Sequence, residues 1–257
     1  LLVTIYYTLG SIPVSIAVAF VIAYLLFFRF RERGRSVLRT IFFLPYITSQ
    51  VAAMMVFKWL FHPQVGLVNA GLGALGIPTQ SWFIDAQPIG AKILSAVGGA
   101  WPQAVPTAFG GPSLALIVII VFWIWHTVGF NVVIFLAGFS GISTTLIDAA
   151  RVDGAGAWAR IRYIILPLLS PMIFFLTVVS VIMSFESFNA FYVFSDGQGS
   201  PQGTTMSLPL YIFRNFYDYG RVGYASAMSV VLFLILLTLT LIQWRVAERR
   251  VHYELDK

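Results

Sequence analysis

The chain has 257 residues, of which 59% are hydrophobic and 10% charged, with a mean hydropathy of +0.86. A soluble domain is about 45–50% apolar and about 25% charged, so this composition argues against a soluble enzyme. The 23 Phe, 7 Trp and 11 Tyr residues exclude a disordered chain, and the lack of Cys excludes disulfides and thiolate sites. The composition predicts a multi-span membrane protein, in which the net charge of +6 sets topology and does not indicate nucleic-acid binding.

Five stretches are long and apolar enough to cross a bilayer, since a spanning helix needs about 20 mostly apolar residues. They cover residues 1–28, 40–61, 113–140, 168–194 and 222–244. The second stretch contains one charged residue, Lys58, whose long side chain is expected to extend to the outer membrane boundary. The sequence therefore predicts an all-α polytopic membrane protein that forms a single transmembrane domain over residues 1–257.

Basic residues in the connections predict the orientation of the spans. The connection between the first two spans contains five arginines and one acidic residue, namely Arg29, Arg31, Arg33, Arg35, Arg39 and Glu32. Positive charge marks cytoplasmic loops, so this connection is expected in the cytoplasm. Alternation then predicts that residues 141–167 and the basic C-terminal tail are cytoplasmic and that residues 62–112 are external. An odd number of spans with an external N-terminus predicts a further span upstream, and so six in the full chain.

The most informative cytoplasmic segment covers residues 145–167. Thr145 and Asp148 resemble a helix capping box, and about two helical turns follow. Gly154 then supplies a helix stop and a corner, and residues 157–165 are predicted to form a second helix. Small residues around the corner permit close approach by another protein, although a plain connection between two spans is the alternative.

The same segment resembles the EAA loop of permease subunits of bacterial binding-protein-dependent ABC importers. The matching pattern is Asp148-Ala-Ala, then Gly154, then Ile164-x-Leu166-Pro167, with Asp148 where that family usually has Glu. The resemblance extends over nearly the whole chain and points to the carbohydrate-uptake branch. Further matching stretches are Arg39–Pro45, Lys58–Phe61, Gly66–Asn69, Gly129-Phe130, Phe135–Gly138, Asp196–Thr205 and Gly223–Ser229. A Gly- and Pro-rich stretch within residues 87–112 resembles an insertion.

This resemblance implies a type I ABC importer permease fold. It implies a transport subunit that takes a sugar or sugar-like solute from an extracytoplasmic binding protein and translocates it by alternating access. The cytoplasmic loop would dock into a separate ATPase and couple its closure to movement of the spans. The expected coupling residues are Asp148, Ala149, Ala150, Asp153, Gly154, Leu166 and Pro167. The chain has no G-x-x-x-x-G-K-[ST] phosphate loop, so it is predicted to be no enzyme, and ATP and Mg would be bound by the partner ATPase.

Polar and aromatic residues on the third and fourth spans are candidate contacts for a sugar, which needs hydroxyl, amide and carboxylate groups and aromatic faces. The candidates are His126, Thr127, Phe130, Asn131, Ser180, Met183, Ser184, Glu186, Ser187 and Asn189. Ser180, Ser184 and Ser187 are expected to share one helical face. Serines in membrane helices also bond to their own helix or pack closely, and His126 has an interhelical hydrogen bond as its alternative role. An intramembrane carboxylate such as Glu186 is a functional candidate by default.

The resemblance also implies the partners and the location. They are a second, different permease subunit, two ATPase subunits, an extracytoplasmic solute-binding protein and the bilayer of the bacterial cytoplasmic (inner) membrane, with a cytoplasmic C-terminus and no nucleic acid or resident metal. A secondary transporter or channel subunit without an ATPase is the alternative, but it would need internal repeats or a self-contained ion path. An integral membrane enzyme would need a constellation of reactive groups, and the three histidines lie on different elements.

Overall fold

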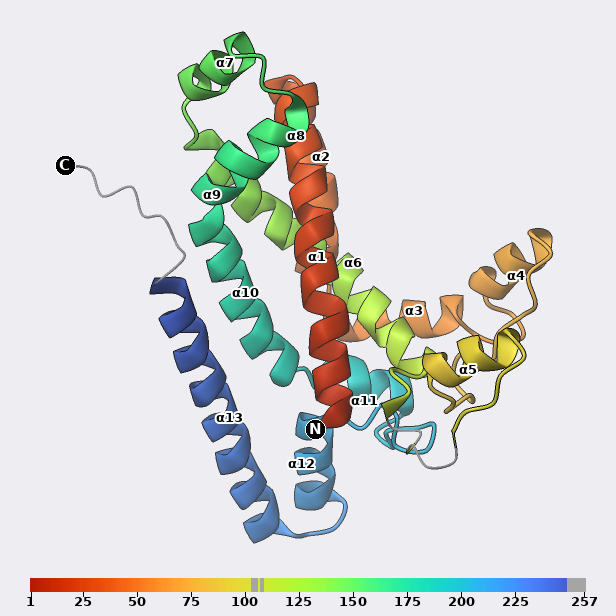
Figure 1. Cartoon of the computed structure of the whole chain (residues 1–257). Coiled ribbons are helices and arrows are strands. Elements are labelled where there is room, and N and C mark those ends of the chain that lie inside the picture. Colours follow the sequence, from red (N-terminus) through yellow and green to blue (C-terminus); the bar gives the residue numbers. More distant parts are fainter. Residues whose placement is uncertain (103–105, 107–108, 249–257) are drawn as a thin grey trace. The chain divides into compact units, whose positions relative to one another are not determined.

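The computed structural model describes residues 1–102, 106 and 109–248; Arg249, Arg250 and Lys257 of the predicted basic tail lie outside these residues. Within the described residues the regular structure is helical, apart from an isolated antiparallel bridge between Pro88 and Ser113 (Figure 1). The prediction of an all-α protein is confirmed.

The helices follow one another without intervening strands in the described part of the chain. In chain order they are α1 (Leu2–Arg29), α2 (Glu32–Ile47), α3 (Gln50–Leu60), α4 (Leu67–Ala74), α5 (Ile89–Ala96), α6 (Leu114–Ser140), α7 (Thr144–Val152), α8 (Ala157–Arg160), the π-helical turn η2 (Ile161–Ile165), α9 (Leu166–Leu168), α10 (Ser170–Phe185), α11 (Asn189–Ser195), α12 (Leu208–Tyr217) and α13 (Val222–Glu248).

Three of these helices, α1, α6 and α13, are each long and apolar enough to cross a membrane. They correspond to the first, third and fifth predicted spans. Two further spans arise where two helical segments meet at a bend and are counted together: α2 with α3, at 93°, and the segment from α8 to α9 with α10, at 65°. The described residues therefore contain three candidate spans, or up to five.

The second and fourth predicted spans each contain a break in the helix. Residues 40–61 are interrupted after Ile47, where Ser49 adopts a non-helical ψ of 120°. Pro45, which lacks a backbone N–H group, lies in the last turn of α2. Residues 168–194 are interrupted after Phe185, and α11 begins only at Asn189. At this second break the Ser187 carbonyl accepts a hydrogen bond from Ser207 Oγ at 3.4 Å instead of continuing the helix.

Contacts divide the chain into two compact units. Unit 1 comprises Leu1–Ser11, Thr48–His126 and Met183–Leu234, and unit 2 comprises Ile12–Ile47, Thr127–Ile182 and the described part of Ile235–Lys257. This grouping does not test the predicted single domain, which stays a prediction.

The core of unit 1 is aromatic. Tyr7, Phe122 and Phe191 are fully buried, and the Tyr7 ring meets Trp123 and Phe191 edge-on with centroids 5.8 and 4.9 Å apart. Buried Met54 from α3 belongs to the same cluster. These contacts hold the first turns of α1 against α6 and α11.

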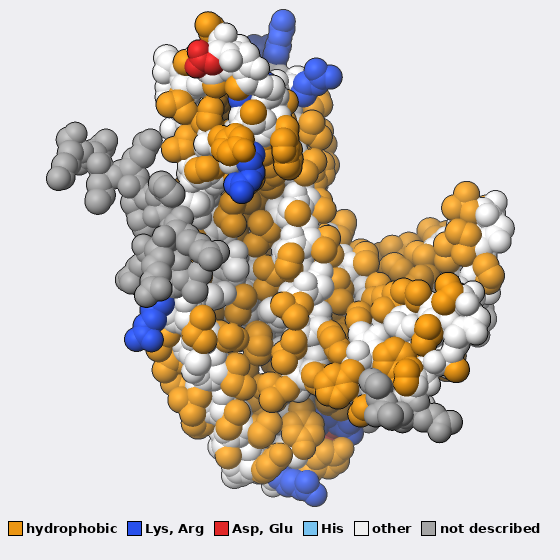
Figure 2. Space-filling model, viewed as in Figure 1, with side chains coloured by type: hydrophobic (Ala, Val, Ile, Leu, Met, Phe, Trp, Pro, Cys, Tyr) orange, Lys and Arg blue, Asp and Glu red, His pale blue; other side chains and the backbone are white. Residues whose placement is uncertain are grey.

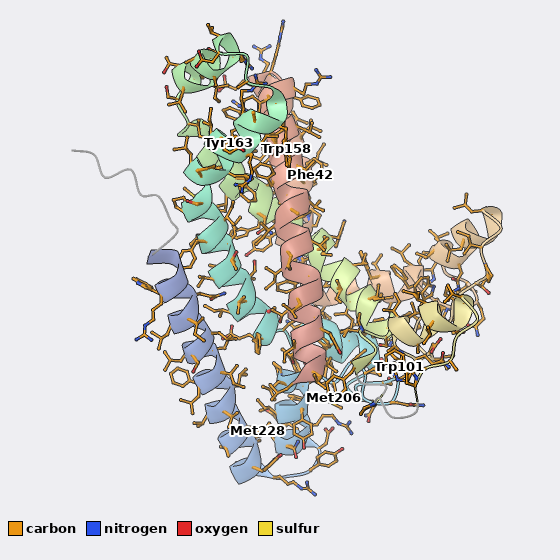
Figure 3. The ribbon with its side chains drawn as sticks, in the orientation of Figure 1. Phe42, Trp101, Trp158, Tyr163, Met206 and Met228 are labelled. Atoms are coloured by element: carbon orange, nitrogen blue, oxygen red, sulfur yellow. The ribbon has the colours of Figure 1, made fainter. Side chains whose placement is uncertain are left out.

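The core of unit 2 is centred on Phe139 of α6. Its ring lies 5.5 to 5.9 Å from the rings of Phe20, Phe27 and Phe28 on α1. On the same helix, a Cβ at Gly129 would come within 1.9 Å of the carbonyl oxygen of Phe42 on α2. Only glycine permits α2 and α6 to approach so closely (Phe42 is labelled in Figure 3).

The membrane-type helices differ in burial. In the most apolar window of α6, 61% of the residues are buried, whereas in that of α13 only 6% are. Exposed residues of α13 include Phe233 and Leu241, at 62% and 56% exposure. Figure 2 shows hydrophobic side chains over much of the visible face, as expected for a surface that contacts lipid or another membrane protein.

Candidate functional site

The first candidate site is the 144–168 segment in unit 2, which folds as two short helical pieces around a corner. Helix α7 ends in a Schellman motif: the Ala155 N–H donates to the Ala150 carbonyl at 2.9 Å, and the Gly154 N–H to the Arg151 carbonyl at 3.1 Å. Gly154 has a φ of +78°, the left-handed region that favours glycine. The predicted corner at Gly154 is confirmed.

The predicted capping box at the start of this segment is wrong. Helix α7 begins at Thr144, two residues earlier than a capping box at Thr145 requires, with Ser143 as the N-cap residue, so Thr145 already lies within the first turn. Thr145 shares a hydrogen bond of 2.6 Å with the Ser143 hydroxyl. Asp148 accepts a hydrogen bond from Arg151 at 2.9 Å and therefore does not cap the helix.

The second half of the segment extends through α8, η2 and α9 to Leu168, slightly beyond the predicted end. The π-helical turn over Ile161–Ile165 directly precedes α9, in which Pro167 lacks an N–H group. The helix then bends by 65° before α10 begins. Ile147 of α7 and Ile165 of η2, at 5% and 2% exposure, anchor the segment in the core of unit 2.

The 144–168 segment exposes apolar side chains that have no cover within the described chain. Val152, Trp158 and Tyr163 are 89%, 73% and 76% exposed (Trp158 and Tyr163 are labelled in Figure 3). Among the predicted coupling residues, Asp148, Ala149, Asp153 and Gly154 are exposed, whereas Ala150, Leu166 and Pro167 are half-buried. A compact apolar surface of this kind suits contact with another protein.

The second candidate site is formed in unit 1 by the two helix breaks. The residues after the first break start α3, and those after the second start α11. Asn189 Nδ2 donates to Gln50 Oε1 at 3.3 Å, which joins the first residues of the two helices. Transporters commonly build their solute sites from such discontinuous helices.

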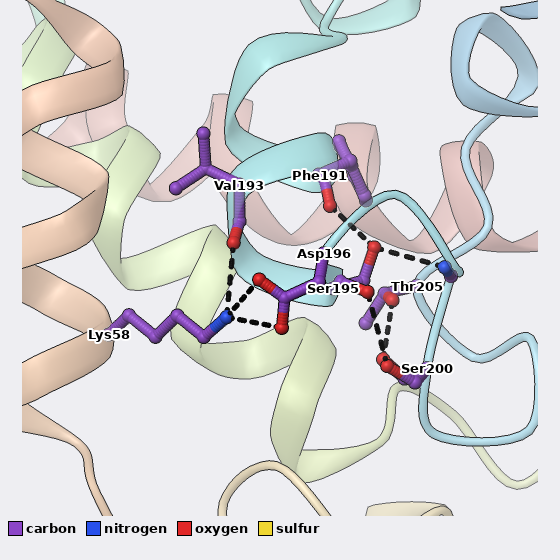
Figure 4. A network of polar contacts seen from close by, with 8 residues as sticks. Lys58, Phe191, Val193, Ser195, Asp196, Ser200 and Thr205 are labelled. Carbon is purple, nitrogen blue, oxygen red and sulfur yellow. Dashed lines mark hydrogen bonds and ion pairs between the residues drawn. The ribbon is translucent and has the colours of Figure 1, made fainter.

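The far ends of α3 and α11 are joined as well. Lys58 Nζ lies 2.7 and 2.6 Å from the two carboxylate oxygens of Asp196 and 3.4 Å from the Val193 carbonyl oxygen (Figure 4). The two helices therefore run side by side in the same direction, bonded at both ends. The sequence-based expectation that Lys58 extends to the membrane boundary missed this ion pair.

The chain after α11 folds back on itself. Asp196 adopts a left-handed φ of +50°, and Ser195 Oγ donates to the Phe191 carbonyl at 2.7 Å and accepts from the Gly199 N–H at 3.0 Å. Thr205 Oγ1 donates to the Ser200 carbonyl at 2.7 Å (Figure 4). These bonds fix the position of the Asp196 carboxylate opposite Lys58.

Two predicted solute contacts in unit 1 are buried and bonded to α1. Ser184 Oγ lies 2.9 Å from Thr8 Oγ1, and Ser187 Oγ lies 3.3 Å from the Tyr7 hydroxyl. Both serines are at most 6% exposed. The prediction that Ser184 and Ser187 share one helical face is wrong, because α10 ends at Phe185, between them. Both side chains nevertheless contact residues of α1. Their contact with a solute stays a prediction.

The other predicted contacts in unit 1 divide by exposure. His126 is 8% exposed, with its ring 5.6 Å from that of Phe122, and Met183 packs against the aromatic core. Glu186 and Asn189 are exposed, Glu186 within the break itself. Of the predicted set in unit 1, these two present polar groups to a molecule outside the chain.

In unit 2 the predicted contacts form a second polar cluster. Asn131 Nδ2 donates to Ser15 Oγ at 2.9 Å, and Ser15 Oγ lies 3.1 Å from Thr127 Oγ1. The Phe130 ring stacks on Tyr46 with centroids 5.0 Å apart. Ser180, the remaining member of the set, is half-buried on α10.

Sequence reasoning missed a stripe of polar residues on α1, of which Thr8 and Ser15 contact the predicted candidates. Thr4, Thr8, Ser11 and Ser15 are all buried. Their spacing of four, three and four residues places them on one helical face, which was a readable signal inside an apolar span. Gln50 was also missed, and the preceding Pro45 is the signal that could have located the break beside it.

In the connection between α4 and α6, Asp85 pairs with Lys92 of α5. Burial by itself raises the pKa of Asp85, but the hydrogen bonds from Lys92 and the Gln87 N–H and the charge of Lys92 outweigh it and leave the pKa below its ordinary value. The stability from this pair is therefore present above the ordinary Asp pKa and is lost as the pH falls through the lowered value.

Comparison with known proteins identifies the family of this chain. Residues 11–253 match the family "Binding-protein-dependent transport system inner membrane component". The probable ABC transporter permease protein YesP of Bacillus subtilis is 34% identical over 98% of this chain and 72% of its own length. The lactose transport system permease protein LacF of Rhizobium radiobacter is 30% identical over 96% of this chain and 74% of its own length. The sn-glycerol-3-phosphate transport system permease protein UgpA of Yersinia enterocolitica is 31% identical over 95% and 71%.

Solved structures agree with these relatives in fold. A chain of a bacterial ABC transporter involved in the import of the acidic polysaccharide alginate aligns with a TM-score of 0.77, at 22% identity, over 97% of this chain and 78% of its own length. The predicted permease fold is confirmed, and the matches argue against a secondary transporter or channel. The chain belongs to the family of binding-protein-dependent transport system inner membrane components, and it is a multi-pass transport subunit of the inner membrane.

Proposed function

We propose that this chain is the permease subunit of an ATP-driven importer for a sugar or sugar-like solute. The observation that carries the proposal is the exposed apolar surface of the 144–168 segment, which is anchored in unit 2 and has no cover within the described chain. The names of LacF and UgpA, a lactose and a glycerol-3-phosphate permease, support a solute of this class.

The 144–168 segment would insert into a cleft of a separate ATPase subunit. Val152, Trp158 and Tyr163 supply the apolar contact, and the exposed small residue Ala149 allows close approach. Asp148, Asp153 and Gly154 shape the corner, while Leu166 and Pro167 lead from it into α10. Because Ile147 and Ile165 are locked in the core, a displacement of the corner would be transmitted to the helices. The ATPase, and not this chain, would bind ATP and Mg.

The solute would be recognised where the helices break. Glu186 and Asn189 offer a carboxylate and an amide to sugar hydroxyl groups, and Gln50 holds Asn189 in place. The buried hydroxyls of Ser184 and Ser187 would set the position of α1 through Thr8 and Tyr7. In unit 2 the corresponding candidates are Phe130 and the Asn131–Ser15–Thr127 cluster.

The proposed assembly contains a second, different permease, two ATPase subunits and an extracytoplasmic binding protein. Positive charge between α1 and α2 favours a cytoplasmic location for that connection, for the 144–168 segment and for the C-terminus. Residues 62–112 would then face the binding protein. The exposed surface of α13 is available to lipid or to the second permease.

Co-purification tests the coupling proposal. The chain, expressed with its genomic neighbours and extracted in mild detergent, is expected to bring down an ATPase subunit in stoichiometric amount. Recovery of a second permease without any ATPase would contradict it. A thermal-shift screen of the cognate binding protein against sugars and polyols then identifies the solute.

Glu186→Gln tests the solute contact in the assembled importer. We expect the KM for transport to rise about tenfold, since a lost hydrogen bond to a charged group is worth roughly 1.5–3 kcal/mol, while the thermal stability stays the same. Asp218→Asn, which changes an exposed carboxylate of unit 1 beyond the end of α12 and weakens its ion pair with Arg214, is the control for a change of charge away from the break. Equal transport kinetics in both variants would remove Glu186 from the solute site.

A further inference from the structure

A cavity of about 430 Å³ lies in unit 2 between the first turns of α2 and the last turns of α1 and α6. Glu32, the first residue of α2, lines the cavity, and one helical face of this helix adds Arg35, Ser36 and Arg39 to the wall. The spacing of these residues, i, i+1 and i+4, directs both arginines to the same side of the helix. Neither of the candidate sites described above includes this cavity.

Arg35 is held in place before any ligand arrives. Its guanidinium lies over the ring of Phe27, 5.0 Å from the centroid, and 3.6 Å from a carboxylate oxygen of Glu32. The Arg35 side chain is 25% exposed, whereas that of Glu32 is 92% exposed. The planar guanidinium stacked on an aromatic ring is a fixed donor, and a lysine would not reproduce this arrangement.

Arg39 adds a second positive charge one turn further along α2. Within the residues that the structure describes, it makes no ion pair. Like charges four residues apart on a helix repel each other, and the exposed Glu32 offsets only part of the charge. An anion between the two guanidinium groups would remove this repulsion and accept charge-assisted hydrogen bonds from both.

The opposite wall of the cavity is apolar. It is formed by Val133, Leu136 and Ala137 near the C-terminal end of α6, and Ser140 adds a hydroxyl at the rim. Both α1 and α6 are long enough to span the membrane, and the cavity lies where these helices end. Its ligand therefore meets charge on one side and hydrocarbon on the other, at the depth of lipid headgroups.

We propose that this cavity binds an anionic phospholipid, with the phosphate between Arg35 and Arg39 and the glycerol and first acyl carbons against the α6 wall. Basic pockets between membrane helices recognise such headgroups, and anionic lipids are abundant in the cytoplasmic leaflet. The proposal requires that α1 and α6 cross the bilayer and rests on the proposed cytoplasmic location of the α1–α2 connection, but it does not depend on the proposals on coupling and on the solute.

Lipid titration of the purified, assembled importer, followed by native mass spectrometry, tests this site. The wild type is expected to bind phosphatidylglycerol about tenfold more tightly than phosphatidylcholine. The double variant Arg35→Gln, Arg39→Gln is expected to lose this preference. The double variant Arg31→Gln, Arg33→Gln removes the same charge from exposed residues of the same connection that do not line the cavity, and it is expected to keep it.

Three results would overturn the proposal. The first is an equal loss in both double variants, which would indicate diffuse attraction to a basic surface. The second is displacement of phosphatidylglycerol by millimolar inorganic phosphate, which would assign the site to a soluble phosphate. If the Arg35→Gln, Arg39→Gln protein does not assemble, Ala137→Phe fills the cavity from its exposed wall without changing charge. The third result that would overturn the proposal is an unchanged affinity of Ala137→Phe for phosphatidylglycerol.

Discussion

The α3–α11 pair of unit 1 and the 144–168 segment of unit 2 are both built from short helices next to a break, but they differ in what covers them. The pair is bonded within the chain at both ends, through Gln50 and Asn189 and through Lys58 and Asp196. The 144–168 segment instead leaves Trp158 and other apolar side chains open. A surface completed within the chain serves positioning, whereas an uncovered apolar surface depends on another protein.

The largest effect is expected from a substitution in the uncovered 144–168 segment. Gly154→Trp places a bulky side chain at a residue with φ +78°, so the corner is strained and the new indole stands out from its exposed surface. We expect complete loss of the substrate-stimulated part of the ATPase activity of the reconstituted importer, with normal membrane insertion. Wild-type stimulation in this variant would contradict the proposed role of the segment.

Gly156→Ala is the matched control for that substitution. Gly156 has an ordinary φ of −63°, and no atom lies within 4 Å of the added Cβ. Its stimulated ATPase activity should equal that of the wild type. If Gly156→Ala lost as much stimulated ATPase activity as Gly154→Trp, the segment would be sensitive to any substitution. The effect of Gly154→Trp could then not be assigned to the geometry of the corner.

The next largest effect is expected on the stability of the protein, from a substitution of Gly129, which lies where α6 packs against α2. Gly129→Ala would bring its Cβ to 1.9 Å from the Phe42 carbonyl oxygen, so α2 must move away from α6. We expect the free energy of unfolding in mixed micelles to fall by about 1–3 kcal/mol, as for other overpacked cores. Gly71→Ala, on α4 with no atom within 4 Å, should leave stability unchanged or raise it. Equal melting temperatures for the two variants would refute the close approach.

Sequence reasoning succeeded where the signal is local. α1, α6 and α13 were predicted because each is an unbroken apolar run, and the corner at Gly154 was predicted because a left-handed residue favours glycine. The breaks after Ile47 and Phe185 were missed, since a window average over a long apolar stretch does not register two or three non-helical residues.

Contacts between distant residues were out of reach for a different reason. Lys58 and Asp196 are 138 residues apart, and neither carries a local sign of the other. The contact of Ser184 with Thr8 was closer to prediction, because Thr8 belongs to a polar stripe of α1 that is visible in the sequence. A stripe indicates which face is buried but not which helix covers it, and the solute candidates could therefore not be separated from packing residues.

A double-mutant cycle on Thr8→Val and Ser184→Ala separates those two roles. Loss of either hydroxyl leaves the other without its 2.9 Å partner, although Thr8 also donates to the Thr4 carbonyl. We expect each single variant to lower the free energy of unfolding by about 0.5–1.5 kcal/mol, with a coupling of at least about 0.5 kcal/mol. A rise in transport KM for Ser184→Ala with no coupling to Thr8 would instead assign Ser184 to the solute.

The smallest expected effect concerns the bond that completes the α3–α11 pair. In the Lys58–Asp196 ion pair the side chains are 30% and 80% exposed, so water and salt screen most of the attraction. Lys58→Met should therefore lower the free energy of unfolding by no more than about 1 kcal/mol, and the difference should shrink at high salt. Arg151→Met, which breaks the exposed Asp148–Arg151 pair of the 144–168 segment, sets the scale for a surface ion pair. If the free energy of unfolding instead fell by about 3 kcal/mol or more and salt did not reduce the difference, the Lys58–Asp196 pair would behave as a buried ion pair that is shielded from water.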